Sequence, residues 1–174
     1  MIKGDIEAQH SSPRVRQVLR FLCDEMLHGL GRWLRAAGYD TVIAADRLPD
    51  RALATRCAGE DRILLTKDRD LAATAAATAP VLLVRGNGID EAARALRAAL
   101  DIDWQHAPFT RCIVDNRPLE AAPRNSTARV PERSRAAGDP LRMCPECGRL
   151  YWSGGHVRRM QQRLAAWQRE RAGC

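Results

Sequence analysis

The chain has 174 residues, of which 45% are hydrophobic and 28% are charged, and its formal net charge at pH 7 is +7. This length accommodates one α/β domain with a small appendage, and the hydrophobic fraction permits a real core. The longest uncharged stretch, 71–84, is too short to span a membrane and contains Pro80, which excludes a membrane-spanning protein.

Arginine far outnumbers lysine in this basic chain. Such a composition favours a polyanionic partner, with nucleic acid as the first candidate, although GC-rich coding alone also enriches arginine. The first residues lack the apolar core of a signal peptide, so we expect a cytoplasmic protein. In that compartment the six cysteines are expected to be metal ligands or free thiols.

Regular elements begin at Val18, after a polar stretch at 1–17 that we expect to be a flexible leader. Short apolar runs predict strands, and apolar residues at helical spacing predict helices. The predicted strands are 18–23, 41–45, 63–66 and 81–84, and the predicted helices are 26–37, 50–57, 70–78 and 89–100. This alternation predicts an α/β fold whose parallel sheet is covered on both faces.

Two glycines, Gly29 and Gly31, fall inside the first predicted helix. Each costs roughly 1 kcal/mol relative to alanine in a helix interior. Either another part of the chain approaches the backbone closely at these positions, or this helix is weaker than its pattern suggests.

Acidic residues follow three of the predicted strands. Asp24 and Asp68 come directly after the first and third strands, Asp46 follows the second, and Asp50 opens the next helix. Because ligands bind where the carboxyl ends of parallel strands meet, these carboxylates are expected to converge there and to bind Mg²⁺ or Mn²⁺. Such an ion is a common means of cutting a phosphodiester. The alternative is that the acids only cap helices.

The composition changes after Asp103, which indicates a second unit at 105–174. Its segment 117–141 is rich in Pro, Arg, Ser and Ala and is expected to be a flexible insert. A basic C-terminal helix is predicted at 156–171, with its arginines beside an apolar stripe. These arginines either form a solvated face or bind phosphates.

Four residues of this unit have the spacing of zinc ligands. Cys144 and Cys147 form a C-x-x-C turn followed by glycine, and Cys112 is followed three residues later by Asp115. Aspartate can bind Zn²⁺, so a Cys3Asp site is possible. The alternatives are His156 as the fourth ligand, or a weakened or lost site.

Several motifs, taken in order, resemble the Mut-seven C-terminal ribonuclease family. They are the segments 21–27, 30–41, 62–71, 111–112, 118–120, 130–131, 144–152 and 155–156, together with Met160. The resemblance implies a PIN-like three-layer sandwich with a parallel central sheet at 18–104, followed by a zinc-ribbon-like module at 105–174. It also implies a metal-dependent ribonuclease that acts on RNA.

The resemblance also implies roles for individual residues of this chain. Asp24 and Asp68 match the acids of the nuclease centre, and either Asp46 or Asp50 matches the third acid. The resemblance implies that Thr66, Lys67 and Arg69 orient the phosphate, and Arg32 and Arg35 are further candidate phosphate contacts. Asp115 stands where the family has cysteine.

Two other functions compete with this interpretation. A non-catalytic RNA-binding module would use only the basic surface and the ribbon. A phosphatase of the aspartate–x–aspartate class would need an acid at position 26, where this chain has Met26. A toxin-type role would require an antitoxin partner, which one sequence does not reveal.

Overall fold

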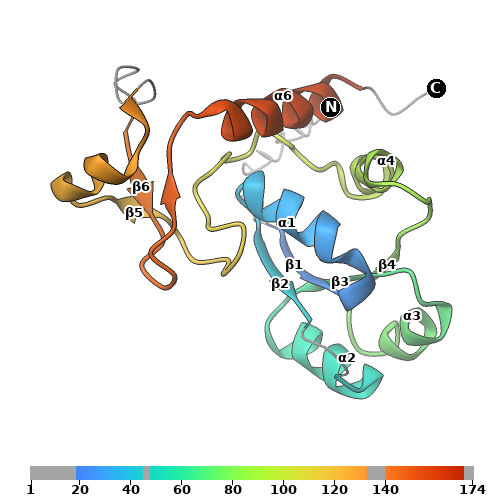
Figure 1. Ribbon diagram of the computed structural model, residues 1–174. Coiled ribbons are helices and arrows are strands. Elements are labelled where there is room, and N and C mark those ends of the chain that lie inside the picture. Colours follow the sequence, from blue (N-terminus) through green and yellow to red (C-terminus); the bar gives the residue numbers. More distant parts are fainter. Residues whose placement is uncertain (1–18, 45–47, 133–139, 171–174) are drawn as a thin grey trace, which may run out of the picture.

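A computed structural model describes residues 19–44, 48–132 and 140–170. Its centre is a four-stranded sheet in the order β2-β1-β3-β4, in which every neighbouring pair is parallel (Figure 1). The strands are β1 (Arg20–Cys23), β2 (Asp40–Ile43), β3 (Ile63–Thr66) and β4 (Val81–Leu83). The predicted α/β class and parallel sheet are therefore confirmed.

Helices cover both faces of this sheet, as Figure 1 shows. On one face lie α1 (His28–Ala36) and α4 (Ile89–Leu100), and on the other lie α2 (Asp50–Gly59) and α3 (Arg69–Ala75). The side chains of β1 alternate accordingly. Phe21 and Cys23 pack in the core on the α1 side, whereas Leu22 packs in the core on the α2 side. This alternation follows from the two-residue period of a strand.

The strand order creates a topological switch point between β1 and β3. The chain moves from β1 to β2 in one direction, then crosses back to place β3 on the opposite side of β1. Loops that follow β1 and β3 therefore diverge and leave a crevice, which is the usual ligand position in an open α/β sheet. Asp24 and Asp68 lie in these two loops.

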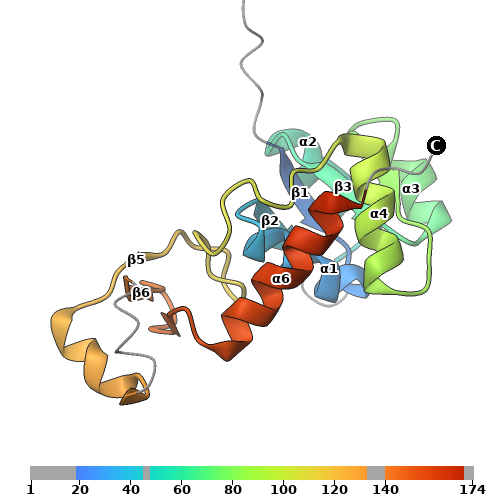
Figure 2. The same cartoon turned by 90° about the horizontal axis from the view of Figure 1, so that it is seen from above.

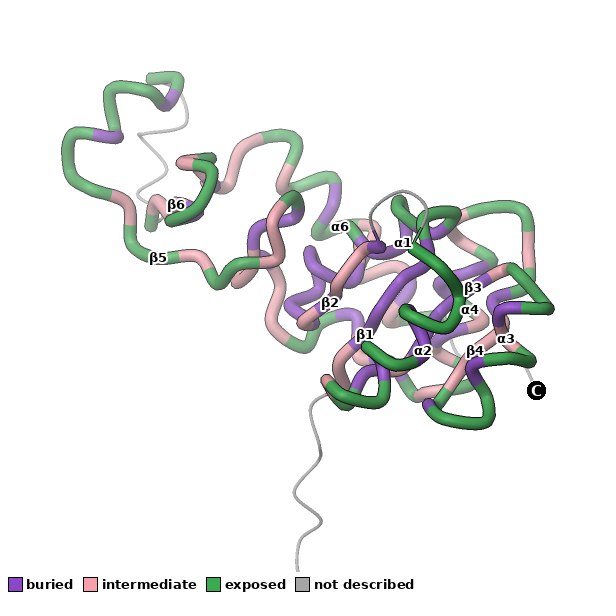
Figure 3. The backbone as a smooth tube through the Cα atoms, turned by 90° about the horizontal axis from the view of Figure 1, so that it is seen from below, coloured by how far each residue is buried: buried purple, intermediate pink, exposed green. Residues whose placement is uncertain are grey.

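The C-terminal part forms a second, antiparallel sheet in the order β5-β6-β7. Its elements are β5 (Glu120–Ala121), the 3-10 helix η2 (Arg124–Arg129), β6 (Arg142–Met143), β7 (Leu150–Tyr151) and α6 (Gly155–Arg169). Figure 2 shows α6 lying across α1 and α4, while β5 and β6 extend away from the parallel sheet. Figure 3 shows that the projecting part is largely exposed.

A shared core joins the two parts. Trp167 of α6 contacts Trp33 of α1, with ring centroids 4.9 Å apart, and Trp104, with centroids 5.0 Å apart. One hydrophobic cluster includes Leu34 of α1 together with Leu164 of α6. Residues on both sides of the predicted boundary between 104 and 105 thus belong to one hydrophobic cluster. Among the described residues, none of the helices combines the length and apolar character needed to cross a membrane.

Two local predictions differ from the structure. The helix predicted from residue 26 begins instead as a 3-10 turn, η1 (Glu25–Leu27), because the Asp24 side chain caps that turn. The predicted flexible insert contains β5 and η2 in its described part, 117–132. Backbone hydrogen bonds pair β5 with β6. Such pairing does not require an apolar pattern in the sequence, so composition alone did not indicate it. The predicted leader, 1–17, lies outside the described residues.

The two glycines of α1 differ in how much space surrounds them. A Cβ at Gly31 would lie 2.6 Å from Cγ1 of Ile43 and 3.3 Å from Sγ of Cys23, so this glycine allows α1 to approach the sheet closely. A Cβ at Gly29 would meet nothing within 4 Å. We therefore expect Gly31→Ala to lower the free energy of unfolding by about 1–2 kcal/mol through overpacking.

Gly29→Ala is the matched control for this prediction. It adds the same methyl group to the same helix without a clash, so it should raise the free energy of unfolding by up to about 1 kcal/mol. Urea denaturation followed by circular dichroism measures both changes. Equal effects of the two substitutions would contradict the close approach at Gly31.

Candidate functional site

The carboxylate of Asp24 is held in place at the end of β1. Its Oδ1 accepts a hydrogen bond of 2.7 Å from the backbone N–H of Glu25, and its Oδ2 accepts one of 2.9 Å from the hydroxyl of Thr66. The Asp24 residue is only 9% exposed. Its own N–H donates to the carbonyl of Leu65, which ties it to the neighbouring strand β3. Asp24 is thus fixed in orientation before any ligand binds.

Asp68 caps the helix that follows β3. Its Oδ1 accepts hydrogen bonds of 2.7 Å from the N–H of Asp70 and 3.1 Å from that of Leu71. The N–H of Asp68 donates to the hydroxyl of Thr66 over 3.0 Å. Oδ2 of Asp68 has no hydrogen bond within the described residues, which leaves this oxygen available to a ligand.

Thr66 connects the two acidic loops. Its hydroxyl donates to Asp24 and accepts from the N–H of Asp68, and the residue is fully buried. This placement differs from its predicted role as a phosphate contact. A hydroxyl that is buried and already hydrogen-bonded on both sides holds the acids in register and does not reach a substrate.

The acids line one cavity of about 190 Å³ at the switch point. Asp24, Asp50 and Asp68 line it together with Glu25, which sequence reasoning did not include among the site residues. The pair of adjacent acids directly after β1 is the sequence feature that could have indicated Glu25 as a site residue. Asp46, the other predicted acid, lies outside the described residues.

This cavity has no basic residue among its described lining residues. Its remaining walls are apolar, formed by Met26, Ala44, Leu48, Leu53 and Leu71. Carboxylates that converge without a counter-charge repel one another, and a hard divalent cation relieves that repulsion. Carboxylate oxygens are ligands that suit Mg²⁺ or Mn²⁺. Among the described residues, however, these carboxylates do not form a group of ligand atoms close enough together to hold one ion as they stand.

The predicted phosphate contacts are distributed elsewhere. Arg35 is 7% exposed, and its guanidinium donates to the carbonyls of Thr41, Ile113 and Val114. It is a structural residue in the interior, contrary to the prediction. Two of its three acceptors lie 78 and 79 residues away in the sequence, so no local pattern indicates this role. Lys67 donates to the carbonyl of Gly86 over 2.8 Å.

The other two predicted contacts are exposed but do not line the acidic cavity. Arg69 opens α3 on the surface, and Arg32 lies on the exposed side of α1 beside a different cavity. The acidic cavity and the basic residues are therefore separate features of the surface.

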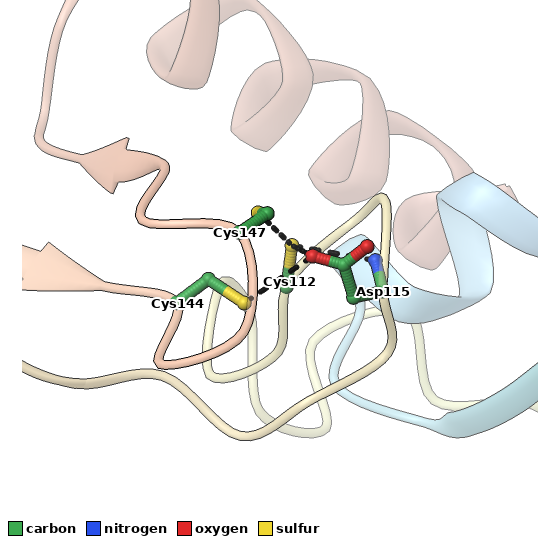
Figure 4. Close-up of side chains that lie close together, drawn as sticks. All are labelled: Cys112, Asp115, Cys144 and Cys147. Carbon is green, nitrogen blue, oxygen red and sulfur yellow. Dashed lines mark hydrogen bonds between the residues drawn. The ribbon is translucent and has the colours of Figure 1, made fainter.

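A second cluster lies in the C-terminal part, where two turns of matching geometry face each other (Figure 4). In one turn the N–H of Cys144 donates to the carbonyl of Arg149, and Gly148 has a positive φ of 66°. In the other, the N–H of Cys112 donates to the carbonyl of Arg117, and Asn116 has a φ of 67°. In both turns, therefore, the closing hydrogen bond joins two residues that are five positions apart.

These turns bring four ligand groups together. One ligand atom from each of Cys112, Asp115, Cys144 and Cys147 lies within 4.8 Å of all the others. Oδ2 of Asp115 is 3.5 Å from Sγ of Cys112 and 3.4 Å from that of Cys144, and the Sγ atoms of Cys112 and Cys147 are 3.9 Å apart. Two sulfurs bound tetrahedrally at ~2.3 Å from zinc would be about 3.8 Å apart. The donor set fits a metal such as zinc.

Neighbouring groups prepare two of these ligands for the charged form that binds metal. Burial opposes ionisation of Cys112, but hydrogen bonds from the hydroxyl of Tyr151 and the N–H of Asp115 bring the pKa of this thiol below its ordinary value. Hydrogen bonds from the thiols of Cys147 and Cys144 lower the pKa of the Asp115 carboxyl. His156, the alternative fourth ligand, is not part of the cluster.

Comparison with protein families gives one match. A family model described as the Mut7-C RNAse domain matches residues 19–164, which include both the acidic cavity and the cysteine cluster. Searches among curated proteins and solved structures found no match.

The cysteine cluster leads to a prediction about metal content. We expect the purified protein to hold one zinc ion per chain, and Cys144→Ser to lose it and to lower Tm by roughly 5–10 °C. Asp115→Cys should retain zinc and bind it more tightly, because thiolate is the softer ligand. Elemental analysis and competition with a chromogenic chelator measure content and affinity.

Glu146→Gln is the control, since Glu146 lies exposed between the two cysteines of the turn and is not in the cluster. It should leave zinc content and Tm unchanged. Full zinc content in Cys144→Ser would show that the ion is bound elsewhere.

Proposed function

The chain belongs to the Mut7-C RNAse domain family, and from this membership we propose that it hydrolyses RNA phosphodiesters with a divalent cation held by Asp24, Asp68 and Asp50. Mg²⁺ or Mn²⁺ is the proposed ion. The observation that carries the proposal is that these three acids line one cavity, which has no basic residue among its described lining residues.

We further propose that the first part, 18–104, is a PIN-like nuclease domain. Its strand order and the position of its acids support this assignment, because the crevice lies at the carboxyl ends of β1 and β3. The second part, 105–174, is proposed to be a zinc-ribbon-like module. The matching turns at Cys112 and Cys144 support that assignment.

In the proposed reaction a water molecule attacks phosphorus while the P–O3′ bond breaks. The products are a 5′-phosphate and a 3′-hydroxyl, which takes up the proton at O3′. The bound ion would supply acidification of the water and neutralisation of charge on the transition state. Asp24 and Asp68 would hold the ion, and Thr66 would keep both carboxylates in place through its hydroxyl.

Asp50 is the proposed third ligand because it opens α2 and lines the same cavity. Glu25 lines the same cavity and would be a further ligand. Asp46 remains a candidate from the sequence. Arg69 and Lys67 flank the Asp68 turn and are proposed to attract the RNA backbone toward the cavity.

Asp68→Asn tests the proposal. We expect cleavage of a labelled, structured RNA in Mn²⁺ to fall at least 100-fold, or about 2.7 kcal/mol in activation free energy, because a neutral amide binds the ion poorly. The fold should survive, because asparagine caps helices as well as aspartate does. Denaturing gel electrophoresis of the products and circular dichroism measure the two effects.

Asp70→Asn is the matched control, an exposed acid two residues away that does not line the cavity. Its cleavage rate should remain within about threefold of wild type. If wild-type protein binds RNA without cutting it at any metal concentration, the alternative of a non-catalytic RNA-binding module replaces the proposal. Equal cutting by Asp68→Asn and wild type would place the active centre elsewhere.

A further inference from the structure

Another cavity of the described structure is larger than the acidic one. It measures about 660 Å³ and lies where α1, the segment 109–113, β7 and the beginning of α6 meet. Figure 2 shows α6 crossing α1 at this junction. Its volume falls within the range of about 300–1,000 Å³ that is typical of pockets for small organic ligands. No step of the proposed hydrolysis uses it.

Positive charge surrounds this cavity. Arg32, Arg149 and Arg158 line it, and all three are exposed. Within the described residues none of them forms an ion pair, whereas Arg163 on the same helix as Arg158 pairs with Asp90 over 2.8 Å. None of the described residues that line the cavity is an aspartate or a glutamate. Guanidinium groups without partners around a concave surface favour an anionic ligand, and phosphate suits their planar fork.

The interior of the cavity is apolar and partly aromatic. Its walls include Phe109, Ile113, Tyr151, Val157 and Met160, with Trp152 half-buried among them. Trp33 and Trp104 each contact Trp167, whereas Trp152 lines this cavity. A flat ring bordered by arginines is the combination that binds an unpaired base and its phosphates.

Gly154 holds the indole of Trp152 in position. The ring packs directly on the glycine, such that a Cβ at Gly154 would lie 2.6 Å from Nε1 of Trp152. The N–H of Gly154 also donates to the carbonyl of Trp152 over 2.7 Å. The indole therefore lies against the start of α6 and cannot swing toward that side.

We infer that this cavity binds an unpaired nucleotide of the RNA, with its base against Trp152 and its phosphates on Arg32, Arg149 and Arg158. The inference rests on the proposed function, which makes RNA the substrate. An acidic peptide would satisfy the arginines but would leave the apolar interior and the indole without a matching flat group.

The helix α1 links the cavity to the acidic site. It starts just beyond Asp24, and its exposed residues His28 and Arg32 are four positions apart, so they lie on the same face about 6 Å apart along the axis. An RNA strand that follows this face passes from the nucleotide in the cavity to the acids. A nucleotide held in the cavity would then determine which phosphate lies beside the acids.

Binding of a fluorescein-labelled, twelve-nucleotide oligouridine tests the inference. The measurement uses fluorescence anisotropy with the Asp68→Asn protein, which should not cut the probe. We expect the double substitution Arg149→Ala and Arg158→Ala to weaken binding roughly 25-fold at 0.1 M salt and to reduce the salt slope by about 1.4, the effect of two lost phosphate contacts.

The matched control replaces Arg159 and Arg169 with alanine. These exposed arginines are on the same helix and have the same charge, but neither lines the cavity. Binding should change less than threefold. Trp152→Leu should weaken binding at least about fivefold without changing the salt slope, since it removes stacking alone. Melting temperatures check that each variant is folded.

The outcomes separate this inference from the proposed function. If both double variants weaken binding equally, the arginines act only through net charge and the cavity assignment fails, even when wild-type protein still cuts RNA. If no protein cuts RNA but the cavity variants lose affinity selectively, the cavity assignment stands and the nuclease proposal fails. Absence of oligouridine binding by every protein overturns the cavity assignment.

Discussion

The attachment of the first cysteine turn to the parallel sheet is the contact on which the C-terminal part depends. Arg35 donates from within α1 to the carbonyls of Ile113 and Val114, and the side chain of Asn116 bridges Asp40 and the N–H of Thr41. Arg35 and Thr41 are buried, so loss of these bonds would leave polar atoms of these two residues without partners, at a cost of about 1–3 kcal/mol each. The turn is therefore fixed to the sheet with or without a metal ion.

This attachment determines the position of everything that follows in the chain. With Cys112 and Asp115 held against α1, the second turn must approach the same point to complete the cluster. Tyr151 adds to this connection, because its hydroxyl donates to Cys112 and accepts from the N–H of Ile113. The large cavity forms between these fixed parts and α6, and its shape therefore depends on contacts that lie outside it.

Sequence reasoning located the parallel sheet and placed Asp24 and Asp68 after neighbouring strands, because strand and helix periods are local properties. Spacing also predicted that Cys112, Cys144 and Cys147 belong to one metal site, with Asp115 or His156 as the fourth ligand, and the structure groups Asp115 with the three cysteines. Sequence reasoning misplaced Arg35 and Thr66, whose roles depend on partners 78 and 42 residues away. A buried arginine and an exposed one have the same local pattern, so only the folded chain distinguishes them.

The separation of acidic and basic surfaces has a physical consequence for an enzyme of this kind. A cavity lined by Asp24, Asp50 and Asp68 repels RNA until a cation neutralises it, so it contributes little affinity by itself. In the proposed function, arginines placed in a different cavity would supply affinity without pairing with the acids and competing with a cation for them. Binding energy gained away from the scissile phosphate can then position that phosphate at the ion. On this argument α1 connects the two sites. Its first turn lies shortly after Asp24, and Arg32 on its exposed face would contact a bound RNA strand.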